Sequence, residues 1–140
     1  LIDCKAYVYL WKGHPFAEKT FIKFKELNDY PCLSFEQGDT GSVYYAEEIL
    51  SDKDYPRIIK ACDRATMLNL MVGLNGYTIC SGIICEELNG SDYKAVPLDP
   101  DDSECSDIME IGYIVKRNTV ISKTGQLYID ELNKYLFAYR

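Results

Sequence analysis

The chain has 140 residues, a hydrophobic fraction of 47% and a formal net charge of −7, which predicts one domain with a sizeable core. The excess of acidic residues and the scattered Lys and Arg residues argue against direct nucleic-acid binding by this chain. No apolar run reaches the roughly 18 residues of a membrane span, and Asp3, Cys4 and Lys5 interrupt the first ten residues, so they are not a signal-peptide core.

The first half of the chain predicts three strands with helices between them. Residues 6–10 are rich in Tyr and Val and read as a strand, and Gly13, His14 and Pro15 make a turn. Apolar residues spaced along 21–27 indicate a short helix. The remaining elements of this half are a strand at 32–35, a helix at 42–50 and a strand at 57–62.

The second half continues the alternation. A helix at 67–74 ends at Asn75 and Gly76, and a nearly continuous apolar strand follows at 77–80. The pattern of residues 81–88 favours neither a helix nor a strand. Further elements are a turn at 89–90, strands at 93–98 and 110–115 around an acidic loop at 97–107, and an amphipathic helix at 122–137. Strands alternating with helices predict an α/β fold whose sheet is mostly parallel and flanked by helices.

The cysteines predict neither a metal site nor a disulfide framework. The six cysteines stand at 4, 32, 62, 80, 85 and 105, and no pair has the spacing of a metal-binding CxxC motif. His14 is the one histidine and has no ligand-type neighbour. Most of the cysteines lie in apolar runs, so we interpret them as small buried hydrophobic residues of a cytoplasmic, reducing compartment. No cofactor is expected.

The stretch PCLSFEQGDTG at residues 31–41 is the first candidate site. It joins a strand to a helix, where free backbone N–H groups can receive a carboxylate or sulfate, and glycines permit close approach. Glu36 and Asp39 would repel an anion but could receive the ammonium group of an amino-acid-like ligand. The alternative is that Asp39 or Thr40 only caps the helix. The candidate contacts in this stretch are Ser34, Phe35, Glu36, Gln37, Gly38 and Thr40.

Three further residues are weaker candidates. Arg64 and Thr66 lie at a second strand-to-helix turn and could supply a second ligand contact, or they could be a surface Arg and an N-terminal cap. Thr78 lies in the apolar strand and is either a ligand contact or a satisfied core residue. Trp11 and the many tyrosines are interpreted as half-buried strand residues with polar tips.

The ordered series of these elements resembles the effector-binding region of LysR-type transcriptional regulators. The stretches that carry the resemblance are YVYLWKGHPFA, FKELNDYPCLSF, DRATMLNLMVGLNGYTIC, YKAVPL, IGYIVKRN and SKTGQLYIDELNKYL. The family usually has a proline after the apolar strand, where this chain has Ser81 and Gly82. Residues 31–41 further resemble the corresponding loop of the family's cysteine-biosynthesis regulators, which implies an amino-acid-type or sulfur-containing effector.

The resemblance implies one lobe of a type II periplasmic-binding-protein-like fold. The second lobe with its hinge strands would span about 5–115, and a returning helix about 122–138, within a fragment of a longer protein. A small-molecule effector would bind in a cleft between two lobes. DNA would be contacted only through a winged helix-turn-helix domain that this chain lacks, and no membrane would be involved. Self-association would use strand 57–62, helix 66–74 or the closing helix 122–138.

Two other classes of function remain open at this point. A small α/β enzyme would need catalytic motifs, but the sequence has no GxSxG nucleophile elbow, no Walker-type phosphate loop and no metal cluster. A solute-binding protein of a transporter would need export, against which the free cysteines and the missing signal argue. The sequence therefore favours a non-catalytic sensor.

Overall fold

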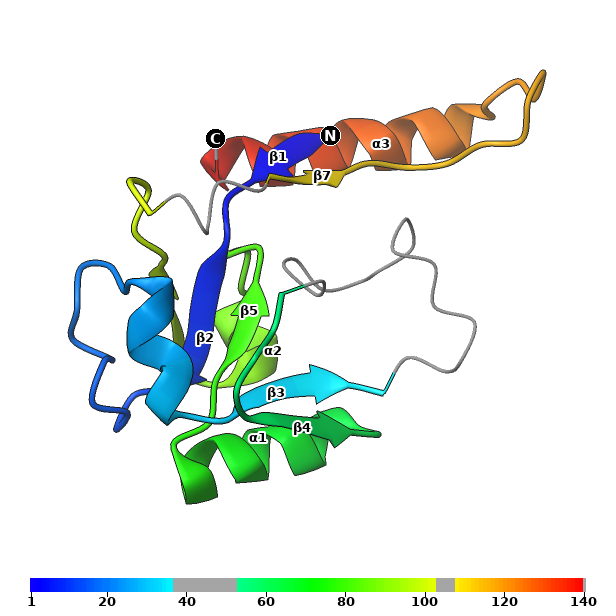
Figure 1. Cartoon of the computed structure of the whole chain (residues 1–140). Coiled ribbons are helices and arrows are strands. Elements are labelled where there is room, and N and C mark those ends of the chain that lie inside the picture. The colour runs from blue at the N-terminus through cyan, green and yellow to red at the C-terminus, as the bar shows by residue number, and fades with distance from the viewer. Residues whose placement is uncertain (37–52, 103–107, 140) are drawn as a thin grey trace.

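The computed structural model describes residues 1–36, 53–102 and 108–139 (Figure 1). The helix predicted at 42–50 and the candidate contacts Gln37, Gly38 and Thr40 lie outside these ranges. The strands are β1 (Ile2–Cys4), β2 (Tyr7–Trp11), β3 (Cys32–Phe35), β4 (Ile58–Ala61), β5 (Thr78–Cys80), β6 (Tyr93–Pro97) and β7 (Met109–Ile111). The helices are the 3-10 helix η1 (Phe24–Asp29), α1 (Arg64–Leu74), α2 (Glu86–Asn89), α3 (Lys123–Leu136) and the 3-10 helix η4 (Phe137–Tyr139).

The described strands form three small sheets, two antiparallel and one parallel, so the prediction of one mostly parallel sheet is not confirmed. Strand β2 lies between β5 and β6 and pairs with both in antiparallel register, and β1 pairs antiparallel with β7. Only β3 and β4 form a parallel pair among the named strands. The prediction followed from the alternation of strands with helices, which does not show that β2 runs against its neighbours.

One strand accounts for most of the antiparallel pairing. Strands β5 and β6 run in the same direction because both oppose β2, and a parallel bridge between Cys32 and Tyr77 places β3 alongside them. Strand β4 follows β3 in parallel. Strands β3, β4, β5 and β6 therefore run in the same direction. Strand β2, which lies between β5 and β6, runs in the opposite direction.

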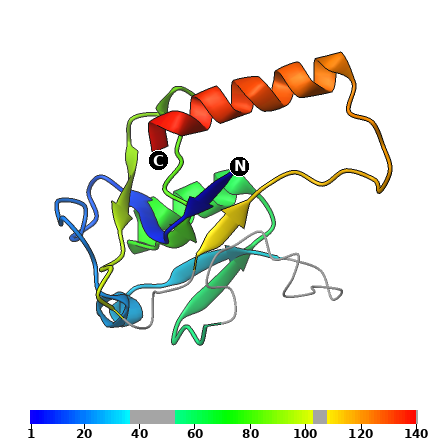
Figure 2. The same cartoon turned by 90° about the horizontal axis from the view of Figure 1, so that it is seen from above.

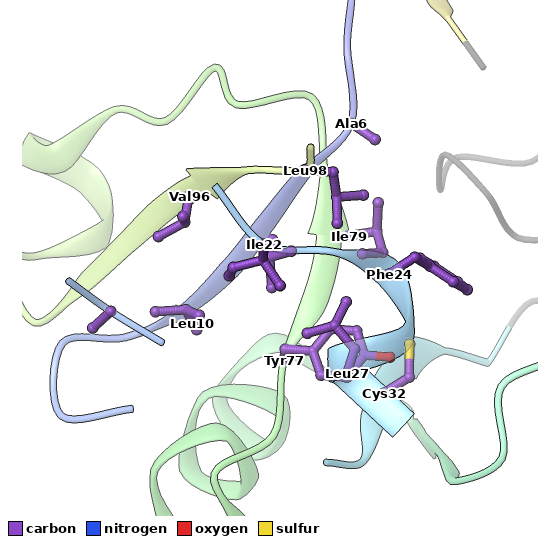
Figure 3. Packing of buried hydrophobic residues seen from close by; sticks show 12 residues of the cluster. Ala6, Leu10, Ile22, Phe24, Leu27, Cys32, Tyr77, Ile79, Val96 and Leu98 are labelled. Carbon is purple, nitrogen blue, oxygen red and sulfur yellow. The ribbon is translucent and has the colours of Figure 1, made fainter. Parts of the chain in front are cut away.

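Strand β2 separates two layers of core. Val8 and Leu10 are fully buried on one face, where they pack with residues of η1, β5 and β6 (Figure 3). Tyr9 points to the opposite face, as the two-residue period of a strand requires. There it packs with Leu33 of β3 and Met67 and Met71 of α1. Helix α1 thus covers the second face and brings its first turn near Tyr9.

Two elements differ from the sequence-based expectation in type or length. The helix predicted at 21–27 is a 3-10 helix at Phe24–Asp29, because Ile22 is taken into a bridge with Leu98 and Pro31 holds Tyr30 extended. The strand predicted at 110–115 ends at Ile111, because its partner β1 has only three residues. Beyond that pairing Ile114 is 93% exposed.

Helix α3 runs past the β1–β7 pair at the end of the molecule away from β3 and β4 (Figures 1 and 2). Leu136 at its C-terminal end is buried against Ile2 and Cys4. Its apolar residues Leu127 and Tyr128 are 65% and 67% exposed. The amphipathic pattern correctly predicted a helix here, but among its residues only Leu136 is fully buried, while Ile129 and Leu132 are half-buried.

The cysteines of the described residues are all free thiols. Cys4 and Cys32 are buried and Cys80 and Cys85 half-buried, in line with the interpretation as hydrophobic residues, but Cys62 is exposed after β4. Its thiol donates to the Glu36 carboxylate at 3.2 Å, and that contact raises the Cys62 pKa. Across the residues that the structure describes, no helix has both the length and the apolar character to cross a membrane.

Candidate functional site

A cavity of about 410 Å³ opens between the end of β3, the start of α1 and strand β7. In open α/β sheets, ligands bind beyond the carboxyl ends of the strands, and Phe35 at the end of β3 forms part of this wall. The cavity is lined by Tyr9, Phe35, Arg64, Met67, Leu68, Thr78, Ile79, Cys80, Ser81, Ile84, Met109 and Ile111. Three of the residues predicted from the sequence, Phe35, Arg64 and Thr78, therefore share one wall.

Arg64 is the first residue of α1, and it is the one charged residue among the described residues that line the cavity. A cation in the first turn of a helix opposes the helix dipole, so helix stability does not explain its place. Asp63 precedes it, but both carboxylate oxygens of Asp63 accept hydrogen bonds from Thr66, and Asp63 forms no ion pair with Arg64. Arg64 forms no ion pair within residues 1–36, 53–102 and 108–139.

Tyr9 supplies the most deeply buried polar group of the cavity wall. The side chain is 5% exposed, and its ring stacks on Tyr93 with 5.8 Å between the ring centroids. The buried hydroxyl has no hydrogen-bond partner of good geometry in the described part of the chain. Burial raises the Tyr9 pKa, and the nearby Arg64 guanidinium opposes that rise. The hydroxyl therefore stays protonated and lies beside Arg64.

Three other predicted residues are not part of this wall. The backbone N–H of Thr66 donates to Asp63 Oδ1 at 2.9 Å and its hydroxyl to Oδ2 at 2.7 Å. Thr66 thus completes a cap at the start of α1, although the capping residue is Asp63. The Ser34 hydroxyl contacts the Phe35 carbonyl at 3.3 Å, and the Glu36 carboxylate receives the Cys62 thiol. The roles of Gln37, Gly38 and Thr40 stay predictions, since these residues lie outside the described ranges.

Several lining residues were missed at the level of sequence. Met109 and Ile111 come from β7 and reach the cavity from far along the chain, and no local pattern marks them. Tyr9 was interpreted as a half-buried strand residue with a polar tip. Its signal was the alternation with Val8 and Leu10, which places it on the face opposite the main core and therefore beneath α1.

A second cavity of about 630 Å³ lies beside β1 and is lined by Leu1 to Lys5, Tyr7, Ser81 to Ile83 and Tyr139. It contains none of the predicted site residues, and its charged residues Asp3 and Lys5 have opposite signs. Gly82 in its wall has φ of +76°, and an added Cβ would come within 2.6 Å of the Tyr7 ring. Only glycine fits there, so packing within the fold explains why residue 82 is a glycine. Because the second cavity contains none of the predicted site residues, it is the weaker candidate.

Neither a protein-family model nor a curated protein matches this sequence. Solved structures do match. HinK, a LysR family transcriptional regulator from Pseudomonas aeruginosa, superposes with a TM-score of 0.61 at 14% identity over 96% of this chain and 45% of its own. The effector-binding domain of QuiR, in complex with shikimate, gives a TM-score of 0.54 at 17% identity over 96% of this chain and 62% of its own. Full-length OxyR C199D from Pseudomonas aeruginosa gives 0.50 at 17% identity over 72% of this chain and 33% of its own.

The chain spans less than two thirds of the length of each of these structures, and less than half of the length of HinK and of OxyR. The likeness therefore concerns one part of a larger architecture. It shows that the chain has the fold found in effector-binding domains of LysR-family regulators.

Proposed function

We propose that this chain is the ligand-sensing lobe of a LysR-type transcriptional regulator and that the cavity beside Arg64 binds a small metabolite. The observation that carries the proposal is the combination of this fold with an apolar cavity at the carboxyl end of β3, in which Arg64 is the one charged lining residue described. The effector-binding domain of QuiR holds shikimate, so a domain of the same fold accommodates a small acid. On this proposal the chain is a sensor and has no catalytic activity.

The cavity gives ligand binding a route to conformational change. Its wall combines Phe35 and Arg64 of the lobe with Met109 and Ile111 of β7, the strand that pairs with β1 and leads toward α3. A ligand in this position bridges the lobe and the β1–β7 pair. Binding can shift a conformational equilibrium only if one state makes better contacts with the ligand than the other. The β1–β7 pair is the element whose position would distinguish the two states.

On this proposal, a winged helix-turn-helix domain elsewhere in the protein contacts DNA. The protein would then be cytoplasmic. The net charge of −7 is unfavourable for contact between this chain and a phosphate backbone. A dimer would form through β4 and α1, as the family resemblance implies. In support, Ile58 of β4 is 49% exposed, and Val72 and Leu74 of α1 are 45% and 49% exposed.

The proposed ligand class is an amino-acid-type or sulfur-containing metabolite, which rests on the resemblance of residues 31–41 to cysteine-biosynthesis regulators. Glu36 and the Gly38–Thr40 stretch would contribute contacts beside those of the cavity. O-acetylserine and cysteine are therefore the first metabolites to measure.

Thermal unfolding and calorimetry with a metabolite panel that includes these two compounds test the function. A ligand present at about 100 times its Kd adds about 2.7 kcal/mol to the free energy of unfolding. Leu68→Trp would fill the cavity and should abolish this gain, whereas Leu127→Trp on the exposed face of α3 should preserve it. Ligands that stabilise the Leu68→Trp variant as much as the unchanged protein would show that they bind elsewhere.

A further inference from the structure

The charges around the cavity are distributed unevenly for so acidic a chain. In a chain whose net charge is −7, the described lining contains no carboxylate and one guanidinium, that of Arg64. The Asp63 carboxylate, adjacent in sequence, caps α1, and the Glu36 carboxylate receives the Cys62 thiol, so neither forms an ion pair with Arg64. The guanidinium is therefore left to attract an anion that enters the cavity.

The Tyr9 hydroxyl is a second sign of a ligand, since it makes no hydrogen bond of good geometry within the described residues, although the Arg64 guanidinium lies near it. A buried hydroxyl without a well-formed hydrogen bond is unfavourable, so proteins rarely keep one without a reason. This hydroxyl lies next to Arg64 and belongs to the same cavity wall. Because it remains protonated, it can donate to an acceptor oxygen. The remaining wall, formed by residues such as Met67, Leu68 and Ile84, is apolar.

We propose that the cavity selects a small ligand with one carboxylate on an apolar body, whose carboxylate bridges the Arg64 guanidinium and the Tyr9 hydroxyl. This inference rests on the proposed function and deepens it, since it names the chemical group that the site recognises. The guanidinium donates to one or both carboxylate oxygens, and the phenol donates to one of them. The apolar body then covers Met67 and Leu68, where it is removed from water.

The start of α1 favours the same orientation. Negative charge is stabilised near the N-terminus of a helix, where the Asp63 carboxylate caps α1, and α1 has no further acidic residue in its first turn. An anionic group beside Arg64 thus meets both the side-chain charge and the positive end of the helix dipole. A ligand in the reverse orientation would place its carboxylate against the apolar residues of β7, Met109 and Ile111, and would lose both interactions.

Three probes of nearly equal shape distinguish the effect of ligand charge from the effect of ligand shape. They are cyclohexanecarboxylate, cyclohexanecarboxamide and cyclohexylmethylamine. Calorimetric titration of the protein should give the carboxylate at least tenfold tighter binding than the amide, and the ammonium compound the weakest binding. The advantage of the acid should shrink as salt is added, because Arg64 is exposed on one side. Binding of the amide as tight as that of the acid overturns the inference.

Single substitutions assign the selectivity to the two residues. Arg64→Gln should reduce the preference for the acid over the amide to less than threefold, and Tyr9→Phe should weaken acid binding threefold to tenfold and amide binding less, because the amide oxygen accepts the weaker hydrogen bond. Arg117→Gln makes the same chemical change at an exposed position outside the cavity and should alter neither. Retention of the full preference by Arg64→Gln, with a normal unfolding transition, overturns the inference.

The results also separate this inference from the proposed function. If metabolites bind in a manner that Leu68→Trp blocks, but acids have no advantage over amides, the sensor function stands and the carboxylate site is wrong. If no metabolite and none of the three probes binds, both proposals are wrong.

Discussion

The two ends of helix α1 are built in opposite ways. At the C-terminal end, Asn75 adopts a left-handed conformation with φ of 50°, and its side-chain oxygen accepts the Trp11 indole N–H at 2.9 Å. The Asn75 carbonyl lies 3.1 Å from His14 Nε2, and His14 Nδ1 accepts the Phe16 N–H at 3.0 Å. Every polar group named here has a partner. At the N-terminal end, Arg64 has no ion-pair partner among the described residues, and the Tyr9 hydroxyl, near the Arg64 guanidinium, has no hydrogen bond of good geometry there.

The contacts at the C-terminal end of α1 stabilise the lobe, whereas the polar groups at its N-terminal end remain available to bind a ligand. A closed network fixes α1 against the turn after β2, so substitutions there should reduce stability without changing ligand binding. An end with unused polar groups contributes little to stability, and substitutions there should change ligand binding instead. The following three predictions test that division, in order of decreasing expected effect on stability.

The largest effect is expected at Asn75. Asn75→Ala removes the acceptor of the Trp11 indole and forces alanine into a left-handed backbone, at roughly 1 kcal/mol for each loss. The free energy of unfolding should fall by about 2 kcal/mol in urea denaturation. Asn75→Gly loses only the hydrogen bond, because glycine accepts positive φ, and should fall by about half as much. Equal losses in the two variants would show that backbone conformation does not matter at this end.

Sequence reasoning predicted the C-terminal end of α1 more completely than the site. Asn75 and Gly76 after an apolar run marked the helix end directly, and the structure confirms it, because that signal is local. At the other end the sequence indicated the turn with Arg64. It could not place Tyr9, Met109 and Ile111 in the same wall, since their meeting depends on strand order and on β2 running against its neighbours.

A smaller, pH-dependent effect is expected from His14. Burial lowers the pKa of His14 below its ordinary 6.5, and the neutral ring uses Nδ1 as an acceptor, which protonation would turn into a donor facing the Phe16 N–H. The unfolded chain therefore takes up this proton at higher pH than the folded one. The stability contributed by neutral His14 is fully present above about pH 6.5 and is lost as the pH falls through the lower folded pKa.

Urea denaturation between pH 7.5 and pH 5 measures this loss. His14 is the only histidine of the chain, so the decline in this window should vanish in a non-titrating His14→Phe variant, even if that variant is less stable throughout. A free energy of unfolding that rises as the pH falls from 7 to 5.5 would contradict the assignment of a buried neutral ring. Where the unchanged protein and the His14→Phe variant are both fully folded, they should bind a ligand equally, because His14 is not in the cavity wall.

The smallest effect on stability, and the only one of opposite sign, is expected for Tyr9→Phe. The substitution keeps the ring that stacks on Tyr93 and deletes a buried hydroxyl that has no partner of good geometry. Removing an unsatisfied buried polar atom is neutral or stabilising, so the free energy of unfolding should stay equal or rise by up to about 1 kcal/mol. Tyr93→Phe is the matched control, because its hydroxyl donates to the Leu68 carbonyl at 3.4 Å and its loss should not stabilise the protein. A Tyr9→Phe variant that unfolds more easily than the unchanged protein would mean that the hydroxyl supports the fold, and this end of α1 would then resemble the other.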